Sequence, residues 1–230
     1  MSIYACIPAR GGSKRIPHKN VKDFLGRPLI SYPIQAALTS GIFNDVIVST
    51  DDPEIAEISE KYGAKVPFLR DKSLADDFTG TFPVTVDAFK KIQTIDPEIE
   101  AICCIYATAP LLTAEHLAHA YKDFTNNRCD CVMSVCEFSF PIQRAQIIDK
   151  NGYLNYREPE FAPRRSQDLQ KCYQDCGLFY FYSKEAIEKN SVKTTRPFIM
   201  PRYRVIDIDT PEDWKMACAM AKAVNDLNYE

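Results

Sequence analysis

The chain has 230 residues, of which 46% are hydrophobic and 26% charged, and these proportions are typical of a globular protein. Its formal net charge of −3 argues against general nucleic-acid binding, which depends on many cationic contacts with phosphates. No apolar run reaches the length of a membrane span, and the first residues lack the pattern of a signal peptide, so we expect no membrane partner.

Strands and helices are expected to alternate along most of the chain. Short apolar runs predict strands at residues 3–7, 45–49, 101–106, 131–137, 177–182 and 205–207. Apolar residues at helical spacing and end signals predict helices at 29–39, from Pro53, at 114–126, at 184–190 and from 211 to about 227. Gly41 is expected to end the first of these helices, and Thr113 and Thr210 to cap two later ones.

Repeated strand–helix units predict an α/β fold with three layers, Rossmann-like, around a mostly parallel sheet. We expect one domain covering 1–230. The alternation breaks at about 138–175, where Pro141, Pro159 and Pro163 interrupt a stretch without helical period. This stretch is expected to form a small inserted arm that contacts substrate or a second copy of the chain.

The opening loop carries the strongest functional signal. Residues 7–20 read Ile-Pro-Ala-Arg-Gly-Gly-Ser-Lys-Arg-Ile-Pro-His-Lys-Asn. Gly11 and Gly12 allow close approach of the backbone to a ligand, and five basic residues lie between Arg10 and Lys22. The loop matches neither a Walker A sequence nor a dinucleotide fingerprint. Its position after the first strand and its charge predict an anionic ligand such as a triphosphate.

Two carboxylates near the end of the chain form a second signal. In the strand predicted at 205–207 and just beyond it, Asp207 and Asp209 would share one face. Such a pair suits Mg²⁺, which takes one or two carboxylates together with substrate phosphates and water. The residues alone leave a second interpretation equally open, in which Asp209 caps the final helix.

Nine cysteines are present, and several lie within apolar, strand-like runs. Cys129 and Cys131, and Cys172 and Cys176, lack the usual spacing of zinc ligands. With no secretion signal, these cysteines favour free thiols and a cytoplasmic location.

The opening loop resembles that of the CMP-sugar synthetases, also called acylneuraminate cytidylyltransferases. That family couples CTP to eight-carbon or nine-carbon acidic sugars. The resemblance rests on the loop through Asn20, on Asp-x-Asp-Thr at 207–210 and on the segment at 69–77, and it covers nearly the whole chain. It implies a nucleotidyltransferase fold, CTP and a nonulosonic acid as substrates, Mg²⁺ as cofactor and assembly as a homodimer.

The resemblance also implies roles for individual residues. Four catalytic residues are expected, namely Lys19, Arg10, Asp207 and Asp209, of which the two aspartates would hold the metal. Nucleotide-binding residues are expected at Ala9, Arg10, Gly11, Gly12, Ser13, Lys14, Asn20, Arg70, Asp77, Thr79 and Thr81. At Arg70 the match is incomplete, because Asp71 replaces the proline of the family, and without the family Arg70 is an ordinary surface arginine.

The segment that is expected to contact the sugar differs in sequence from that of the sialic acid synthetases. Tyr106 and Ala107 stand where those enzymes have Gln-Pro, so the resemblance implies a sugar other than plain N-acetylneuraminic acid and favours pseudaminic acid. Sugar-binding residues are expected at Tyr106, Arg164, Arg165 and Gln167. For the two arginines, contact with the sugar carboxylate and a place on a solvated or dimer-forming surface both remain open.

Three alternative functions remain open. The first is the same reaction on legionaminic acid, N-acetylneuraminic acid or the eight-carbon acid of lipopolysaccharide. The second is a sugar-1-phosphate uridylyltransferase, whose longer Gly-x-Gly-Thr-Arg opening is absent. The third is a non-catalytic nucleotide-binding protein, against which Lys19, Asp207 and Asp209 argue.

Overall fold

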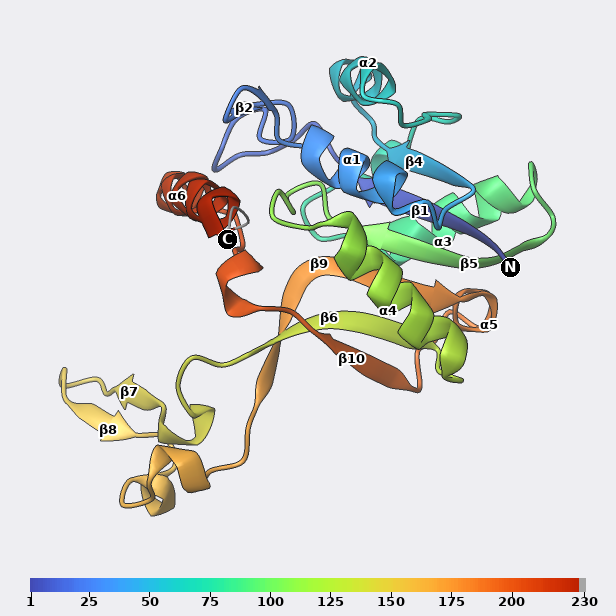
Figure 1. The fold of residues 1–230 in the computed structure, drawn as a ribbon. Coiled ribbons are helices and arrows are strands. Elements are labelled where there is room, and N and C mark those ends of the chain that lie inside the picture. The colour runs from blue at the N-terminus through green and yellow to red at the C-terminus, as the bar shows by residue number, and fades with distance from the viewer. Residues whose placement is uncertain (228–230) are drawn as a thin grey trace.

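A six-stranded sheet forms the centre of the computed structural model, which describes residues 1–227 (Figure 1). The strand order is β10-β6-β9-β5-β1-β4. Every neighbouring pair is parallel except those of β9, which runs antiparallel to β5 and β6. The strands are β1 (Ser2–Pro8), β4 (Asp45–Ser49), β5 (Ile99–Ile105), β6 (Cys131–Glu137), β9 (Tyr173–Ser183) and β10 (Thr195–Ile199). The expected α/β fold with a mostly parallel sheet is confirmed.

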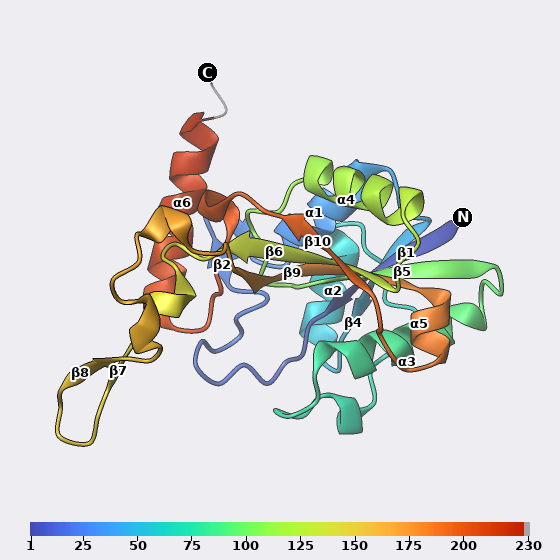
Figure 2. The same cartoon turned by 90° about the horizontal axis from the view of Figure 1, so that it is seen from below.

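Helices cover both faces of this sheet, and Figure 2 shows α1 and α4 on one side with α3 and α5 on the other. Ile34 of α1 and Leu117 of α4 belong to one buried cluster, whereas Phe89 of α3 and Ile187 of α5 belong to a second. No described helix combines the length and apolar character that crossing a membrane requires. The helices are α1 (Ser31–Ser40), α2 (Pro53–Lys61), α3 (Thr81–Gln93), α4 (Ala114–Asn126), α5 (Lys184–Glu188) and α6 (Pro211–Leu227).

Capping residues at the helix ends explain why several predicted helix bounds are confirmed. Gly41 follows α1 with φ 66°, a left-handed conformation that glycine adopts without strain. The Asp52 side chain accepts from two amides of the first turn of α2, and Thr113 caps α4. The Thr210 hydroxyl accepts from the Asp213 amide at the start of α6.

The strand predicted at 205–207 is wrong. Residues 205–209 have irregular backbone, and the last strand of the sheet is β10, which the sequence analysis did not predict. Ile206 and Ile208 made the segment look like a strand, but both pack in a cluster with α6. β10 contains Pro197, which is tolerated there because the strand lies at the edge of the sheet.

Helix α3 was also absent from the predicted elements. Its first turn contains Pro83, and its interior carries the β-branched residues Val84, Thr85 and Val86. β-Branched residues favour strands, so the local sequence signal for a helix is weak. Burial of Phe89 and Ile92 against the sheet supplies the stabilisation that local propensity lacks.

A third buried cluster joins the start of the chain to its last helix. Ile16 and Phe24 pack with Ile208 and with Ala217 and Ala221 of α6. This packing fixes the opening loop beside residues 207–209, although almost two hundred residues separate them in the sequence. The small hairpin of β2 (Asp23–Phe24) and β3 (Arg27–Pro28) ends the loop.

Residues 138–172, here called the arm, leave the sheet between β6 and β9 (Figure 1). The arm contains the hairpin of β7 (Gln146–Ile148) and β8 (Leu154–Tyr156) and short 3₁₀ turns. Both views show the hairpin projecting away from the helix-covered sheet. Several large apolar side chains on the arm are exposed, among them Phe140, Ile147, Ile148, Tyr153 and Leu154.

Candidate active site

A cavity of about 450 Å³ opens beside the carboxyl ends of β1 and β5. Parallel strands place ligands at this end of the sheet, because the loops that follow the strands converge there. The lining includes cationic, hydroxyl and carboxylate side chains from four separate parts of the sequence. These residues are Pro8, Arg10, Ser13, Lys14, Arg15, Ile16, Lys19, Asn20, Asp77, Thr81, Tyr106, Ala107, Thr108 and Asp209.

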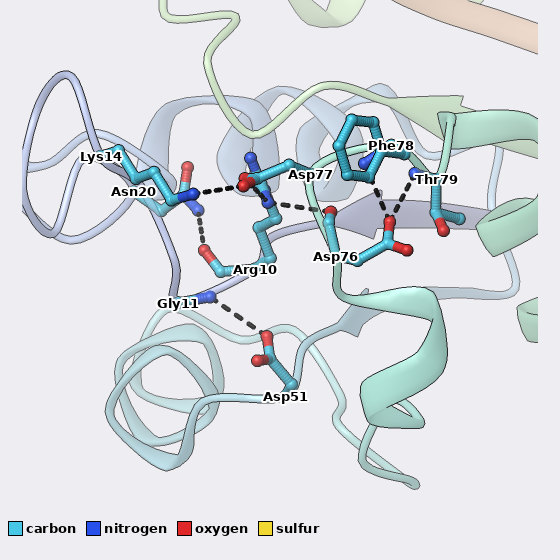
Figure 3. A network of polar contacts seen from close by, with 9 residues as sticks. All are labelled: Arg10, Gly11, Lys14, Asn20, Asp51, Asp76, Asp77, Phe78 and Thr79. Atoms are coloured by element: carbon cyan, nitrogen blue, oxygen red, sulfur yellow. Dashed lines mark hydrogen bonds and ion pairs between the residues drawn. The ribbon is translucent and has the colours of Figure 1, made fainter.

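Asp77 pairs with two of the cations of the opening loop, as Figure 3 shows. Arg10 lies 2.6 Å from one carboxylate oxygen of Asp77, and Lys14 contacts the other. Arg10 also donates to the main-chain oxygen of Asp76 at 2.8 Å. Hydrogen bonds from both cations hold the pKa of Asp77 below its usual range, so this carboxylate is ionised at neutral pH. A bound polyphosphate would therefore compete with Asp77 for the same cations.

Two hydrogen bonds hold the backbone of the opening loop in place. The Gly11 amide donates to the Asp51 carboxylate at 3.1 Å, and the Asn20 side chain donates to the Arg10 carbonyl at 3.0 Å (Figure 3). Asn20 is buried, and its own carbonyl accepts from the Ile30 amide. In this structure Asn20 therefore shapes the loop, and it also lines the cavity.

Gly11 is required by close packing. A Cβ at this position would lie 2.4 Å from a carboxylate oxygen of Asp52, the residue that caps α2. We expect Gly11→Ala to displace this cap and lower the free energy of unfolding by about 1 kcal/mol, or roughly 2–4 °C in Tm. The matched control is Gly12→Ala, because a Cβ there meets nothing within 4 Å. Thermal unfolding should separate the two variants, and equal melting temperatures would contradict this account.

Lys19 is the most enclosed cation of the loop, with 18% of its side chain exposed. Its ammonium group donates to the Ile208 carbonyl at 2.6 Å and lies 3.4 Å from a carboxylate oxygen of Asp209. Arg15 lies 2.8 Å from the other oxygen of Asp209. The cluster formed by Ile16 and Ile208 holds both sides of these contacts together.

Asp209 does not cap the final helix. The Thr210 hydroxyl caps α6, and the Asp213 carboxylate accepts from the Asp209 and Thr210 amides. The side chain of Asp209 instead lies on the cavity wall. Of the two interpretations of Asp209, the structure is compatible with the metal ligand and disagrees with the cap.

Asp207 and Asp209 are close enough to interact electrostatically. The pKa of Asp207 is raised, first by partial removal from water and then by the negative charge of Asp209. Asp209 lines the cavity and Asp207 does not. A divalent cation bound by both would offset their repulsion, because it supplies positive charge beside two carboxylates. The two aspartates thus fit Mg²⁺, whose remaining ligands typically come from phosphates and water.

Another part of the cavity lining carries hydroxyl groups. The Thr81 and Tyr106 hydroxyls lie 3.3 Å apart, and the Tyr106 ring contacts that of Tyr180 with centroids 5.7 Å apart. Gly177 packs beside the Tyr106 ring and has φ 58°, a left-handed conformation that glycine adopts without strain. Tyr106 is therefore held in the cavity lining by its contacts with Thr81 and Tyr180.

Several predicted site residues lie outside the cavity lining. Arg70 is 6% exposed and points into the protein, where its guanidinium donates to the side chain and carbonyl of Ser49. Ala9 is buried, whereas Gly11, Gly12 and Thr79 belong to the segments that surround the cavity. Arg164, Arg165 and Gln167 are exposed on the arm, where Arg165 pairs with Asp168. Within one chain, the structure does not bring these arm residues to the cavity.

Some residues that shape the site are not among the predicted site residues. Asp51 accepts from the Gly11 amide and Asp52 packs closely against Gly11, and their sequence signal is a pair of acidic residues just after a buried strand. Asp175 and Tyr180 support Tyr106, but they are distant in the sequence and only the strand pairing reveals the contact.

A model of the cytidylyltransferase family matches residues 4–224, which is nearly the whole described chain. The chain belongs to the cytidylyltransferase family. Its match includes every element that lines the cavity, from the opening loop to the segment at 207–209.

Known members resemble this cytidylyltransferase over its full length. A pseudaminic acid cytidylyltransferase of Campylobacter jejuni is 45% identical, and the alignment covers 100% of this chain and 99% of that protein. A CMP-N,N'-diacetyllegionaminic acid synthase of Legionella pneumophila is 34% identical with the same coverage. Among solved structures, a CMP:2-keto-3-deoxy-manno-octonic acid synthetase complexed with CTP superposes with a TM-score of 0.71 at 17% identity, covering 97% of this chain and 99% of the other. This last likeness shows the shared fold.

Proposed function

We propose that this cytidylyltransferase joins CTP to the anomeric hydroxyl of pseudaminic acid, giving the CMP-sugar and pyrophosphate. The observation that carries the proposal is the cationic cavity of the opening loop, in which Lys19 faces Asp209 at 3.4 Å. The full-length identity of 45% to a pseudaminic acid cytidylyltransferase supports the choice of sugar.

The loop cations suit the charge of the nucleotide. Arg10 and Lys14 would exchange Asp77 for the outer phosphates of CTP, with help from the Ser13 hydroxyl. Lys19 is fixed by the Ile208 carbonyl, so it needs little reorganisation to stabilise charge that develops at the α-phosphate. Transfer reactions at phosphorus depend mainly on such positioning and charge neutralisation.

Asp207 and Asp209 are the residues that would hold Mg²⁺ in this proposal. When bound, the metal neutralises phosphate charge and lowers the pKa of a coordinated hydroxyl. The protein's own contribution is to hold Asp209 between Lys19 and Arg15. Arg15 and Lys19 form ion pairs with Asp209 before any nucleotide arrives, and their charges also act on Asp207 from a greater distance.

The experiment that tests the function measures pyrophosphate release from CTP and Mg²⁺ with pseudaminic, legionaminic and N-acetylneuraminic acids. We expect the highest kcat/KM with pseudaminic acid. Highest turnover with legionaminic acid would move the assignment toward the Legionella relative, which is 34% identical. No turnover with any acid, together with retained CTP binding, would favour a non-catalytic nucleotide-binding protein.

The arm supports a further part of the proposal, namely a homodimer. Ile147, Ile148 and Leu154 are 53%, 71% and 64% exposed on its hairpin, and apolar side chains gathered in this way favour a protein partner. All nine cysteines are free thiols, which supports a cytoplasmic location.

Sedimentation velocity at micromolar concentration is expected to give about twice the 26.2 kDa mass of one chain. Ile148→Asp should shift the distribution toward the monomer, because a buried unpaired charge is costly at an interface. Lys150→Asp, which changes a polar position of the same hairpin, is the matched control. A monomer in the unaltered protein would contradict the proposal.

A further inference from the structure

The cations of the cavity lining face two carboxylates, Asp77 and Asp209. Each oxygen of Asp209, the proposed metal ligand, contacts a different cation. Asp77 has the same arrangement, with one oxygen 2.6 Å from Arg10 and the other in contact with Lys14. The proposed function gives Asp209 a metal to bind, whereas Asp77 occupies the cations that the outer phosphates of CTP would need. The position of Asp77 therefore calls for a role of its own.

A short turn fixes the backbone beside Asp77. The neighbouring Asp76 carboxylate accepts from the amides of Phe78 and Thr79 at 2.9 and 2.6 Å (Figure 3). The Asp76 carbonyl accepts from Arg10 at 2.8 Å. These hydrogen bonds do not involve the Asp77 side chain, so its carboxylate can leave the cations without breaking the turn. Phe78 is 94% exposed, so packing of this side chain does not hold the turn against the protein.

The ion pairs of Asp77 are partly exposed to water. The exposed fractions of the side chains are 34% for Arg10, 78% for Lys14 and 37% for Asp77. Ion pairs at such exposure are weak, so a polyphosphate with several negative charges can displace this carboxylate. Asp77 nevertheless stays tethered beside the two cations, and a tethered group competes at a high effective concentration. The carboxylate can thus give way to a polyphosphate and return when the polyphosphate loosens.

We propose that Asp77 is an intramolecular competitor of pyrophosphate, which returns to Arg10 and Lys14 after the transfer step, weakens the binding of this product and promotes its departure. The inference rests on the proposed function, in which pyrophosphate is the leaving group. It goes beyond that function because it assigns a residue to product release. Asp77 acts on the anion through the two cations, so it is a positioning residue and not a catalytic one.

The test measures the affinity of the metal-free protein for inorganic pyrophosphate by isothermal titration calorimetry at low ionic strength. Asp77→Asn removes the charge and keeps the size of the side chain, so its Kd should be about 3- to 10-fold lower than that of the unaltered protein. Asp77→Glu keeps the charge and should bind pyrophosphate as weakly as the unaltered protein does. Unchanged or weaker binding by Asp77→Asn would overturn the proposal, because Asp77 would then not compete with the anion.

Glu54→Gln is the matched control. The Glu54 carboxylate also neighbours the opening loop, since it lies 3.4 Å from a ring nitrogen of His18, but Glu54 is outside the cavity lining. Loss of this negative charge should leave the Kd for pyrophosphate unchanged. An equal gain in affinity in Glu54→Gln and Asp77→Asn would reflect only the net charge of the protein and would contradict the role of Asp77.

Failure of this inference can be distinguished from failure of the proposed function. Binding of pyrophosphate involves neither the sugar nor cytosine, so calorimetry tests Asp77 whatever the substrates are. During turnover of CTP and sugar, the inhibition constant of pyrophosphate should also be about 3- to 10-fold lower for Asp77→Asn. Tighter binding by this variant without turnover in either protein would count against the function alone. Normal turnover with equal inhibition of both proteins would overturn the inference alone.

Discussion

Replacing Lys19 with alanine is expected to lower kcat by about 10²- to 10³-fold without loss of the fold. Its ammonium group is largely enclosed and is held by the Ile208 carbonyl, so water cannot easily replace its charge beside the phosphates. The measurement is pyrophosphate release at saturating CTP and sugar. Because the charge acts mainly on the transition state, the KM for CTP should change much less than kcat.

Lys65→Ala is the control for this variant. Lys65 forms an exposed ion pair with Asp45 at the other end of β4 and lies outside the cavity. Its removal should leave kcat unchanged, since exposed ion pairs contribute little. Turnover by Lys19→Ala close to that of the unaltered enzyme, with circular dichroism unchanged, would remove Lys19 from the mechanism.

Asp207→Asn is expected to have opposite effects on activity and stability. Loss of one metal ligand should lower Mg²⁺-dependent turnover by about 10²-fold, the range found for groups that stabilise transition-state charge. Without metal the same variant should melt at a higher temperature at pH 7. The folded protein raises the pKa of Asp207, so ionisation of this group costs stability above the unfolded pKa of about 4, and asparagine removes that cost.

The gain in stability of Asp207→Asn without metal should depend on pH. Below the unfolded pKa, Asp207 is protonated in both states and the stability difference between the two proteins should disappear. Mg²⁺ should raise the Tm of the unaltered protein and affect Asp207→Asn much less. Glu212→Gln, on the exposed start of α6, is the control and should respond to Mg²⁺ like the unaltered protein. A variant that is less stable at pH 7, or equally stabilised by Mg²⁺, would refute this role for Asp207.

The opening loop could be predicted from the sequence because its chemistry is local. Within a dozen residues, glycines, cations and a preceding strand specify the turn and its charge. The same holds for the starts of α2 and α4, where a single capping side chain accepts from the first free amides of the helix.

Contacts between distant segments could not be predicted in this way. Arg70 lies under the end of β4 because Ser49 offers buried acceptors, and nothing near Arg70 in the sequence indicates this. The strand predicted at 205–207 failed because Ile206 and Ile208 pack against α6 instead of a neighbouring strand. Asp207 and Asp209 still interact electrostatically, so their proximity does not depend on the predicted strand.

The packing of the opening loop against α6 also has a consequence for biosynthesis. Lys19 leaves the ribosome 190 residues before Asp209, its partner in the cavity. Until then Ile16 and Phe24 have no Ile208 to cover them, so the nascent loop exposes apolar surface through most of translation. The two sides of the proposed nucleotide site therefore meet only after the residues of the sheet and the arm have been made.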